Sequence, residues 1–247
     1  MRWQANDNLL LRGSWSQGFR IPSISEFYVG QANNFPAVTD PCTLGVTNGP
    51  FCAANGHPVV AKQANGQINT ISGGNPNLTP EKSISKTVGF VYNPDWLPGY
   101  DLSVDYYDIS LVNTVASIGP DNILNGCYFA NVQSYCKLIQ VFTNQVNSIL
   151  DVNTNTGSTL TDGFDISTHY KFPSSSMGDF KLGLDINLLK RFDHTVPNTT
   201  VPGGFAVSKL AGWSVPNATL SSNTGSGASY PKRRATLTRS EEHTSEL

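Results

Sequence analysis

Residues 9–28, LLLRGSWSQGFRIPSISEFY, decide the fold. Up to Arg20, apolar and polar side chains alternate with a period of two, which predicts a β-strand with two unlike faces. One face carries Leu9, Leu11, Trp15 and Phe19, and the other carries Arg12, Ser14, Ser16 and Arg20. A soluble β-sandwich buries its apolar face, whereas a membrane barrel turns that face to lipid and encloses a polar interior. Arginines on the enclosed side favour the barrel.

Composition agrees with a β-strand protein that has no large dry core. Charged residues make up 14% of the chain, against about 25% in typical soluble domains. Hydrophobic residues make up 38%, and no run of about 18 apolar residues exists that would form a transmembrane helix. The formal charge of -2 argues against a nucleic-acid partner, which requires a basic surface.

The same alternation recurs in four later segments, residues 83–92, 100–112, 163–172 and 180–190. These segments are ten residues or longer, whereas strands of globular proteins usually have about 5–6. In residues 100–112 the apolar phase changes at Tyr106 and Tyr107, which predicts a β-bulge at that point. About six spanning strands are therefore expected.

The connections between these strands alternate in length. Residues 20–80, 114–156 and 194–229 are long, whereas 93–101 and 173–179 are short. In an up-and-down sheet this puts every long loop at one end, as in outer-membrane barrels with long extracellular loops and short periplasmic turns. Residues 138–153 have strand character and are expected to form a small hairpin inside the second long loop. A short helix capped by Asp121 is expected just before that hairpin.

Four cysteines form two close pairs in the long loops, Cys42 with Cys52 and Cys127 with Cys136. Their spacing is not CxxC and no histidines cluster nearby, which argues against zinc. Two disulfides are favoured over free thiols, and they imply an oxidising compartment. Aromatic residues near strand ends predict girdles at the two lipid–water boundaries, although ordinary cross-strand packing explains them equally well.

Four ordered segments resemble the TonB-dependent outer-membrane receptors. They are RGSWSQGFRIPSISEFY (12–28), GGNPNLTPEKSISKTVGFVY (73–92), LSVDYYDISLVNTV (102–115) and LTDGFDISTHYKF (160–172). One departure is Thr87, where the family usually has a glutamate. The resemblance implies an all-β, antiparallel up-and-down transmembrane barrel in the bacterial outer membrane. It also implies uptake of a siderophore, vitamin-like cofactor or glycan, energised by the TonB complex.

The resemblance covers only part of such a receptor, because the plug domain and the segment that contacts TonB are not found in the chain. Residues 1–238 are interpreted as a partial barrel domain, with Met1 inside an expected strand. Residues 239–247, RSEEHTSEL, break the strand pattern and resemble a translated sequencing adapter. They are interpreted as a non-native tail, with a genuine acidic tail as the alternative.

No catalytic, metal or cofactor-binding constellation is predicted, so an enzyme is the least favoured class. Asp105 with Asp108 and Asp162 with Asp165 could be read as catalytic carboxylate pairs, but polar positions in the barrel lumen explain them better. The competing functions are a passive porin-like channel and a secreted β-sandwich binding module.

Two groups of residues are candidates for contacts within a receptor. The charges proposed to face the lumen or meet the plug are Arg12, Arg20, Glu26 and Glu81. Solvated loop or lumen charge is the simpler explanation for each of them. The loop aromatics proposed to stack on a ligand are Phe35, Phe51, Tyr128, Phe129 and Trp213.

Overall fold

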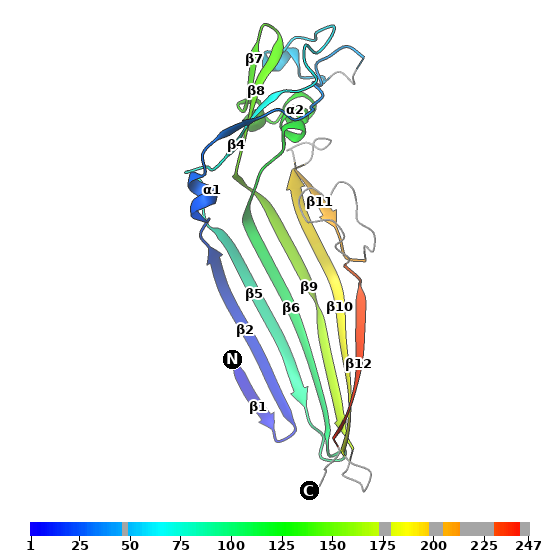
Figure 1. Cartoon of the computed structure of the whole chain (residues 1–247). Helices are drawn as coiled ribbons and strands as arrows, with labels where there is room; N and C mark the ends of the chain where they lie inside the picture. The colour runs from blue at the N-terminus through cyan, green and yellow to red at the C-terminus, as the bar shows by residue number, and fades with distance from the viewer. Residues whose placement is uncertain (46–48, 173–178, 198–204, 213–229, 243–247) are drawn as a thin grey trace.

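A tall curved sheet carries a smaller cap of loops at one end in the computed structural model, which describes residues 1–45, 49–172, 179–197, 205–212 and 230–242 (Figure 1). The sheet has eight strands in the order β1-β2-β5-β6-β9-β10-β11, and β12 also pairs with β10. The bounds are β1 Arg2–Asn6, β2 Leu9–Arg20, β5 Glu81–Tyr92, β6 Tyr100–Ala116, β9 Thr154–Lys171, β10 Asp179–Pro197, β11 Phe205–Lys209 and β12 Arg233–Glu242. Every pairing in it is antiparallel. The predicted up-and-down architecture is confirmed, including its six long strands.

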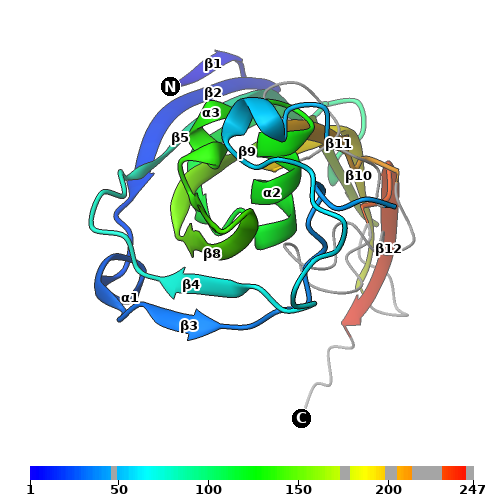
Figure 2. The same cartoon turned by 90° about the horizontal axis from the view of Figure 1, so that it is seen from above.

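The strand register produces the two faces that the sequence predicts. One row of paired residues runs Leu11, Phe90, Val104, Ile166 and Ile186. The adjacent row runs Arg12, Gly89, Asp105, Asp165 and Asn187. Seen from above, the sheet curls from β2 round to β12 as an arc of a barrel wall (Figure 2). The apolar row lies on the convex outside of this arc and the polar row on the concave inside.

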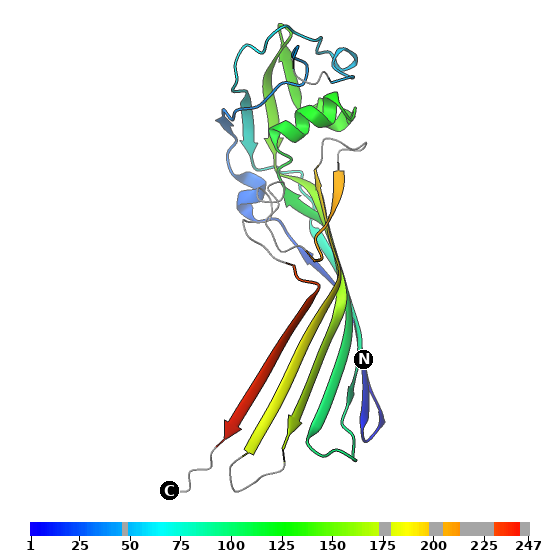
Figure 3. The ribbon, with the colours of Figure 1, turned by 90° about the vertical axis from the view of Figure 1, so that its right-hand side faces the viewer.

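Long and short connections lie at opposite ends of the sheet, as predicted. The turns β1–β2 and β5–β6 lie at the lower end, and the cap lies at the upper end (Figures 1 and 3). Residues 173–178 of the predicted short connection lie outside the described residues. The strands that flank them are joined at the lower end, where the Phe172 N–H donates to the Phe180 carbonyl at 2.9 Å.

The predicted β-bulge at Tyr106 and Tyr107 is wrong. Tyr106 pairs with Val88 and Tyr107 with Thr87 without a register shift. The shift lies further along β6, between Val112 and Thr114, around Asn113 with its φ of 61°. Since the pleat continues through Tyr107, the change of apolar phase has another cause. Just beyond Tyr106 the outward residues of β6 are the polar Asp108 and Ser110, and the apolar Ile109 and Leu111 face inward.

The cap joins the first two long loops in one four-stranded sheet, β3-β4-β8-β7. The predicted hairpin within 138–153 is confirmed as β7 Ile139–Phe142 and β8 Gln145–Val152, which pair antiparallel. β8 also pairs in parallel with β4 Asn69–Gly73 from the first loop, and β4 pairs with β3 Ala32–Asn34. We call residues 32–45, 49–73 and 118–152 the loop cap.

Short helices complete the fold: α1 Ile24–Tyr28 at the rim of the sheet, and η1 Ala53–Asn55, α2 Pro120–Tyr128 and α3 Gln133–Cys136 in the loop cap. Within the described residues, none of these helices has the length and apolar character needed to cross a bilayer. The predicted helix before the hairpin is α2, but Asp121 does not cap it. Gly119 holds the N-cap position without a side-chain hydrogen bond. Instead, the Asp151 carboxylate of β8 accepts the N–H groups of Ile118 and Gly119 at 3.1 and 3.0 Å.

The buried apolar core of the described chain lies in the loop cap, not in the tall sheet. Its members are Val38, Cys42, Cys52, Ile68, Ile118, Ile123, Leu124, Cys127, Tyr128, Tyr135 and Ile149. The two predicted disulfides, Cys42–Cys52 and Cys127–Cys136, are both present. Because the core combines both loops, the cap is a packed unit and not a set of independent loops.

Candidate functional site

The inner wall of the sheet carries an ion pair that spans three strands. Arg12 of β2 donates through Nε to Asp105 Oδ1 of β6 at 2.8 Å, and its second nitrogen contacts Asp105 Oδ2. Gly89 of β5 lies between them in the register. A Cβ at Gly89 would clash with Asp105 Oδ1 and with the Val104 carbonyl. Glycine is therefore required here for Arg12 to reach across β5 in the bidentate geometry that strengthens such pairs.

A second charge cluster, which we call the rim triad, joins Arg20, Glu26 and Glu81 at the upper end of the wall. Arg20 donates to Glu81 at 2.8 and 2.5 Å and to Glu26 at 2.9 and 3.0 Å. Glu81 also accepts the Val115 N–H of β6 at 2.9 Å and is only 7% exposed. The triad thus fixes α1 to the ends of β2, β5 and β6.

Glu26 has two roles, because it also closes the capping box of α1. Its carboxylate accepts the Ser23 N–H at 2.6 Å, while Ser23 Oγ accepts the Glu26 N–H at 3.2 Å. The side chain of Arg20, and then the Ser23 N–H, lower the pKa of Glu26 from 4.5 to about 2. Since the folded-state pKa is the lower one, this stabilisation is complete above pH about 4.5 and is lost as the pH falls through about 2.

The loop cap holds a buried polar centre that sequence reasoning missed. The side chains of His57 and Asp40 lie 2.8 Å apart and are 0% and 1% exposed. Tyr128 packs edge-on against His57 with ring centroids 5.4 Å apart, and its burial raises the pKa of its hydroxyl. Asp40, Cys42 and His57 lie close enough to suggest a metal site. The Cys42 sulfur is bonded to Cys52, so it cannot serve as the third ligand.

The predicted ligand aromatics differ widely in their exposure. Phe35 is 57% exposed, whereas Phe51 and Phe129 are half-buried. Tyr128 is 1% exposed and belongs to the core of the loop cap, where no ligand reaches it. Trp213 lies outside the described residues. Phe35 is therefore the most open ring among the four that the structure describes.

The two aspartate pairs are divided between the faces of the wall. Asp105 and Asp165 pair with one another in the inner row, as the sequence predicts. Asp108 and Asp162 form the outer pair, on the face that carries Leu102 and Val104. The prediction that all four face the lumen is wrong for Asp108 and Asp162. The spacing in the sequence indicates this division, because residues three apart in a regular strand face opposite sides of the sheet.

Comparisons with known proteins give one family. A model described as TonB dependent receptor-like, β-barrel matches residues 1–240. No curated protein sequence matches the chain.

Among solved structures, the siderophore receptor PirA from Acinetobacter baumannii is similar at 13% identity and a TM-score of 0.43, over 96% of this chain and 33% of that one. A variant of the ferric enterobactin receptor from Pseudomonas aeruginosa, in complex with enterobactin, is similar at 12% identity and a TM-score of 0.46, over 96% and 31%. The RagAB peptide transporter is similar at 14% identity and a TM-score of 0.44, over 92% and 19%. The chain thus spans a third or less of the structures it matches.

Proposed function

The chain belongs to the TonB dependent receptor-like β-barrel family, and from this premise we propose that it forms part of the wall of an energised outer-membrane receptor. That family consists of receptors and transporters of the bacterial outer membrane. The observation that carries the proposal is the family match over residues 1–240. These residues form a sheet whose apolar row faces outward and whose polar row faces inward. A lipid-facing outside and a hydrated inside are the requirements for a spanning barrel.

In this proposal, residues 1–238 form a partial barrel domain, and a plug and a TonB-contacting segment belong to the rest of the receptor. β12 extends through Arg239 to Glu242 and pairs with β10 over its whole length. This pairing leaves the interpretation of residues 239–247 as a non-native tail untested, so it stays a prediction. Long-read sequencing of the source DNA beyond Thr238 decides it.

The proposed ligand is a scarce extracellular compound: a siderophore, a vitamin-like cofactor or a glycan. The loop cap supports this role, because two disulfides and a shared core hold it above the wall in one fixed arrangement. A rigid surface loses little conformational entropy when a ligand binds. Phe35 and, at the cap surface, Phe51 and Phe129 are the proposed ligand contacts.

Uptake by the complete receptor tests the proposal. Cells that express it should accumulate a radiolabelled ferric siderophore, vitamin-like cofactor or glycan from a panel that covers the three classes. Accumulation should fall to background when a protonophore collapses the inner-membrane potential, because energised transport needs that gradient. Uptake that continues at the same rate after uncoupling would instead establish a passive channel.

The charges of the inner wall and rim are proposed to contact the plug: Arg12 on the wall, and Arg20, Glu26 and Glu81 at the rim. Glu81→Lys in the complete receptor is expected to lower uptake about tenfold or more, because it leaves unpaired charge at a buried site. Lys86→Glu is the matched control, since Lys86 lies on the same strand but faces outward in the row of Trp15. Unchanged uptake in Glu81→Lys would remove these residues from the plug interface.

A further inference from the structure

The outside of the wall changes from apolar to charged at the same register position on three neighbouring strands. Along β6, β9 and β10 the outward side chains form two apolar rows followed by a charged one. The apolar rows are Val104, Ile166 and Ile186, then Tyr106, Phe164 and Leu188; the charged row is Asp108, Asp162 and Arg191. Tyr106 and Phe164 are in ring contact at 5.2 Å, which gives the upper edge an aromatic boundary.

The apolar band below this charged row has the height of a membrane interior. On β9 it extends from Asp162 down to Phe172, which packs on Tyr170 with ring centroids 4.7 Å apart. Ten residue steps of ~3.3 Å along a strand tilted by ~40° span ~25 Å along the membrane normal. This is the usual height of the apolar band of such barrels, so the charged row lies where lipid headgroups begin.

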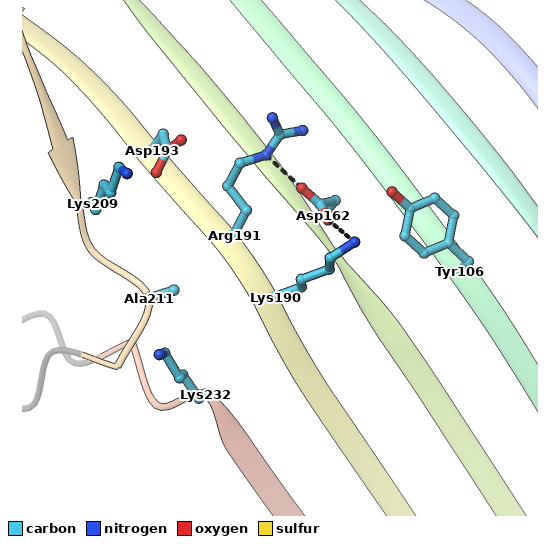
Figure 4. Close-up of a pocket in the computed structure, with 8 residues that line it drawn as sticks. All are labelled: Tyr106, Asp162, Lys190, Arg191, Asp193, Lys209, Ala211 and Lys232. Carbon is cyan, nitrogen blue, oxygen red and sulfur yellow. Dashed lines mark ion pairs between the residues drawn. The ribbon is translucent and has the colours of Figure 1, made fainter.

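A cavity of about 480 Å³ opens on the outer face at this boundary. Its lining includes Tyr106, Asp162, Lys190, Arg191, Lys209 and Lys232 (Figure 4). Strand order in Figure 4 is reversed from Figure 1, so the cavity is seen from the convex side of the sheet. The cavity thus shares Tyr106 with the apolar band, while four of its other lining residues are cations.

A β-bulge in β10 creates this concentration of charge. The register against β9 shifts between Leu189 and Arg191, which leaves Lys190 as the extra residue. In a regular strand Lys190 and Arg191 would face opposite sides, but here both approach Asp162, at 4.0 and 2.5 Å. Arg191 also lies 3.5 Å from Asp108.

Within the described part of the chain, the remaining cations of the cavity have no carboxylate partner. Four cations and two carboxylates, Asp162 and Asp193, line the cavity. With the neighbouring Asp108 as a third carboxylate, the net charge of these seven groups is about +1 at pH 7. Asp108 and Asp162 are both engaged by Arg191. Among the residues that the structure describes, no ion pair joins Lys209 or Lys232 to a carboxylate, including Asp193, the register partner of Lys209. Two ammonium groups without a carboxylate partner in the described chain therefore line the cavity, in a chain whose overall charge is -2.

We propose that this cavity binds the phosphate group of an anionic lipid headgroup in the outer leaflet of the membrane. Lys209 and Lys232 attract the phosphate, and Lys190 supplies a third ammonium group in the cavity. The acyl chains of the lipid pack on the apolar band below, at Tyr106, Phe164 and Leu188. A soluble anion would use the lysines but not the apolar rows, so the continuity of the cavity with the band favours a lipid. The inference rests on the proposed placement in the membrane, but not on energised uptake.

Lipid binding to the complete receptor in a neutral detergent, followed by native mass spectrometry, tests the inference. The probe is bisphosphorylated lipid A, compared with its enzymatically dephosphorylated form. We expect Lys209→Gln/Lys232→Gln to weaken binding of the phosphorylated form about twenty-fivefold, or about fivefold for each lysine removed. Lys82→Gln/Lys86→Gln is the matched control: it removes two outward lysines of β5 that lie outside the cavity and should leave binding unchanged.

The outcomes separate the sources of phosphate and the two proposals. Equal losses of lipid binding in both double variants would overturn the site, since they would show that the lipid is attracted by the overall surface charge and not by this cavity. Equal binding of dephosphorylated lipid would overturn the role of phosphate, and displacement by millimolar inorganic phosphate alone would overturn the choice of a lipid. A receptor that binds the lipid selectively but shows no energised uptake would support this inference and refute the proposed function.

Discussion

Replacing all four cysteines by alanine is expected to lower the free energy of opening of the loop cap by about 5 kcal/mol. The two disulfides have sequence separations of 10 and 9 residues. Loops of that size are each stabilised by about 2.7 kcal/mol in the loop-entropy description. The two bridges lie in different loops, and each sits inside the shared core with Cys42, Cys52 and Cys127 at most 1% exposed. Their contributions should therefore combine.

Hydrogen exchange of the complete receptor in detergent micelles measures this effect segment by segment. Amides of α2 and β8 should lose protection by about a thousandfold or more, because every 1.4 kcal/mol is a factor of ten. Amides of β5, β6 and β9 serve as the internal control, since the ladders between these strands involve neither disulfide. Cap amides that retain their protection would show that the core of Ile123, Leu124 and Ile149 suffices to hold both loops together.

The architecture of the wall could be predicted from the sequence because alternation with a period of two assigns each side chain to one face of the sheet. The alternation in residues 9–20 and 163–172 predicted the inward and outward rows correctly, and the contrast of loop lengths predicted which end carries the cap. The hairpin of β7 and β8 also followed from local pattern. In each case neighbouring residues carry the whole signal, so no distant contact had to be known.

Features that depend on distant residues could not be read in this way. The parallel pairing of β4 with β8 places Thr70 opposite Ile149, and nothing in the sequence of either segment indicates its partner. The acceptor at the start of α2 is Asp151 of the next hairpin, although Asp121 within the helix is the local candidate. The rim triad was predicted only as separate charges, because the reach of Arg20 to Glu81 depends on the β2–β5 register.

The error at Tyr106 and Tyr107 has a physical origin of its own. The change of apolar phase predicts an irregular backbone, whereas the backbone is regular and the surroundings change. Just above Tyr106 the outward residues of β6 are the polar Asp108 and Ser110, while the inward Ile109 and Leu111 are apolar. A change of apolar phase in a barrel strand can therefore indicate either a membrane boundary or a β-bulge.

Placing an arginine on the outward face is the sharpest test of this inside-out arrangement. Ile166 lies near the middle of the apolar band, in the row of Val104 and Ile186. Ile166→Arg is expected to lower the free energy of unfolding of the complete receptor by about 2–4 kcal/mol in lipid vesicles, the cost of arginine on the lipid face near the midplane. Guanidinium titration followed by tryptophan fluorescence measures the change.

The neighbouring residue supplies the control, because one step along a strand reverses the face. Ser167 faces inward, where its hydroxyl donates to Asp185 at 2.5 Å and Asp165 lies on the same side. Ser167→Arg adds the same side chain beside two carboxylates in a hydrated interior, so its cost should stay below about 1 kcal/mol. If the two variants exchanged their effects, the row of Ile166 would have to face water and the row of Ser167 a dry interior, since an unpaired arginine is costly in a protein core as well as in lipid. The sheet would then lack the inside-out arrangement, and the membrane placement of this chain would fail.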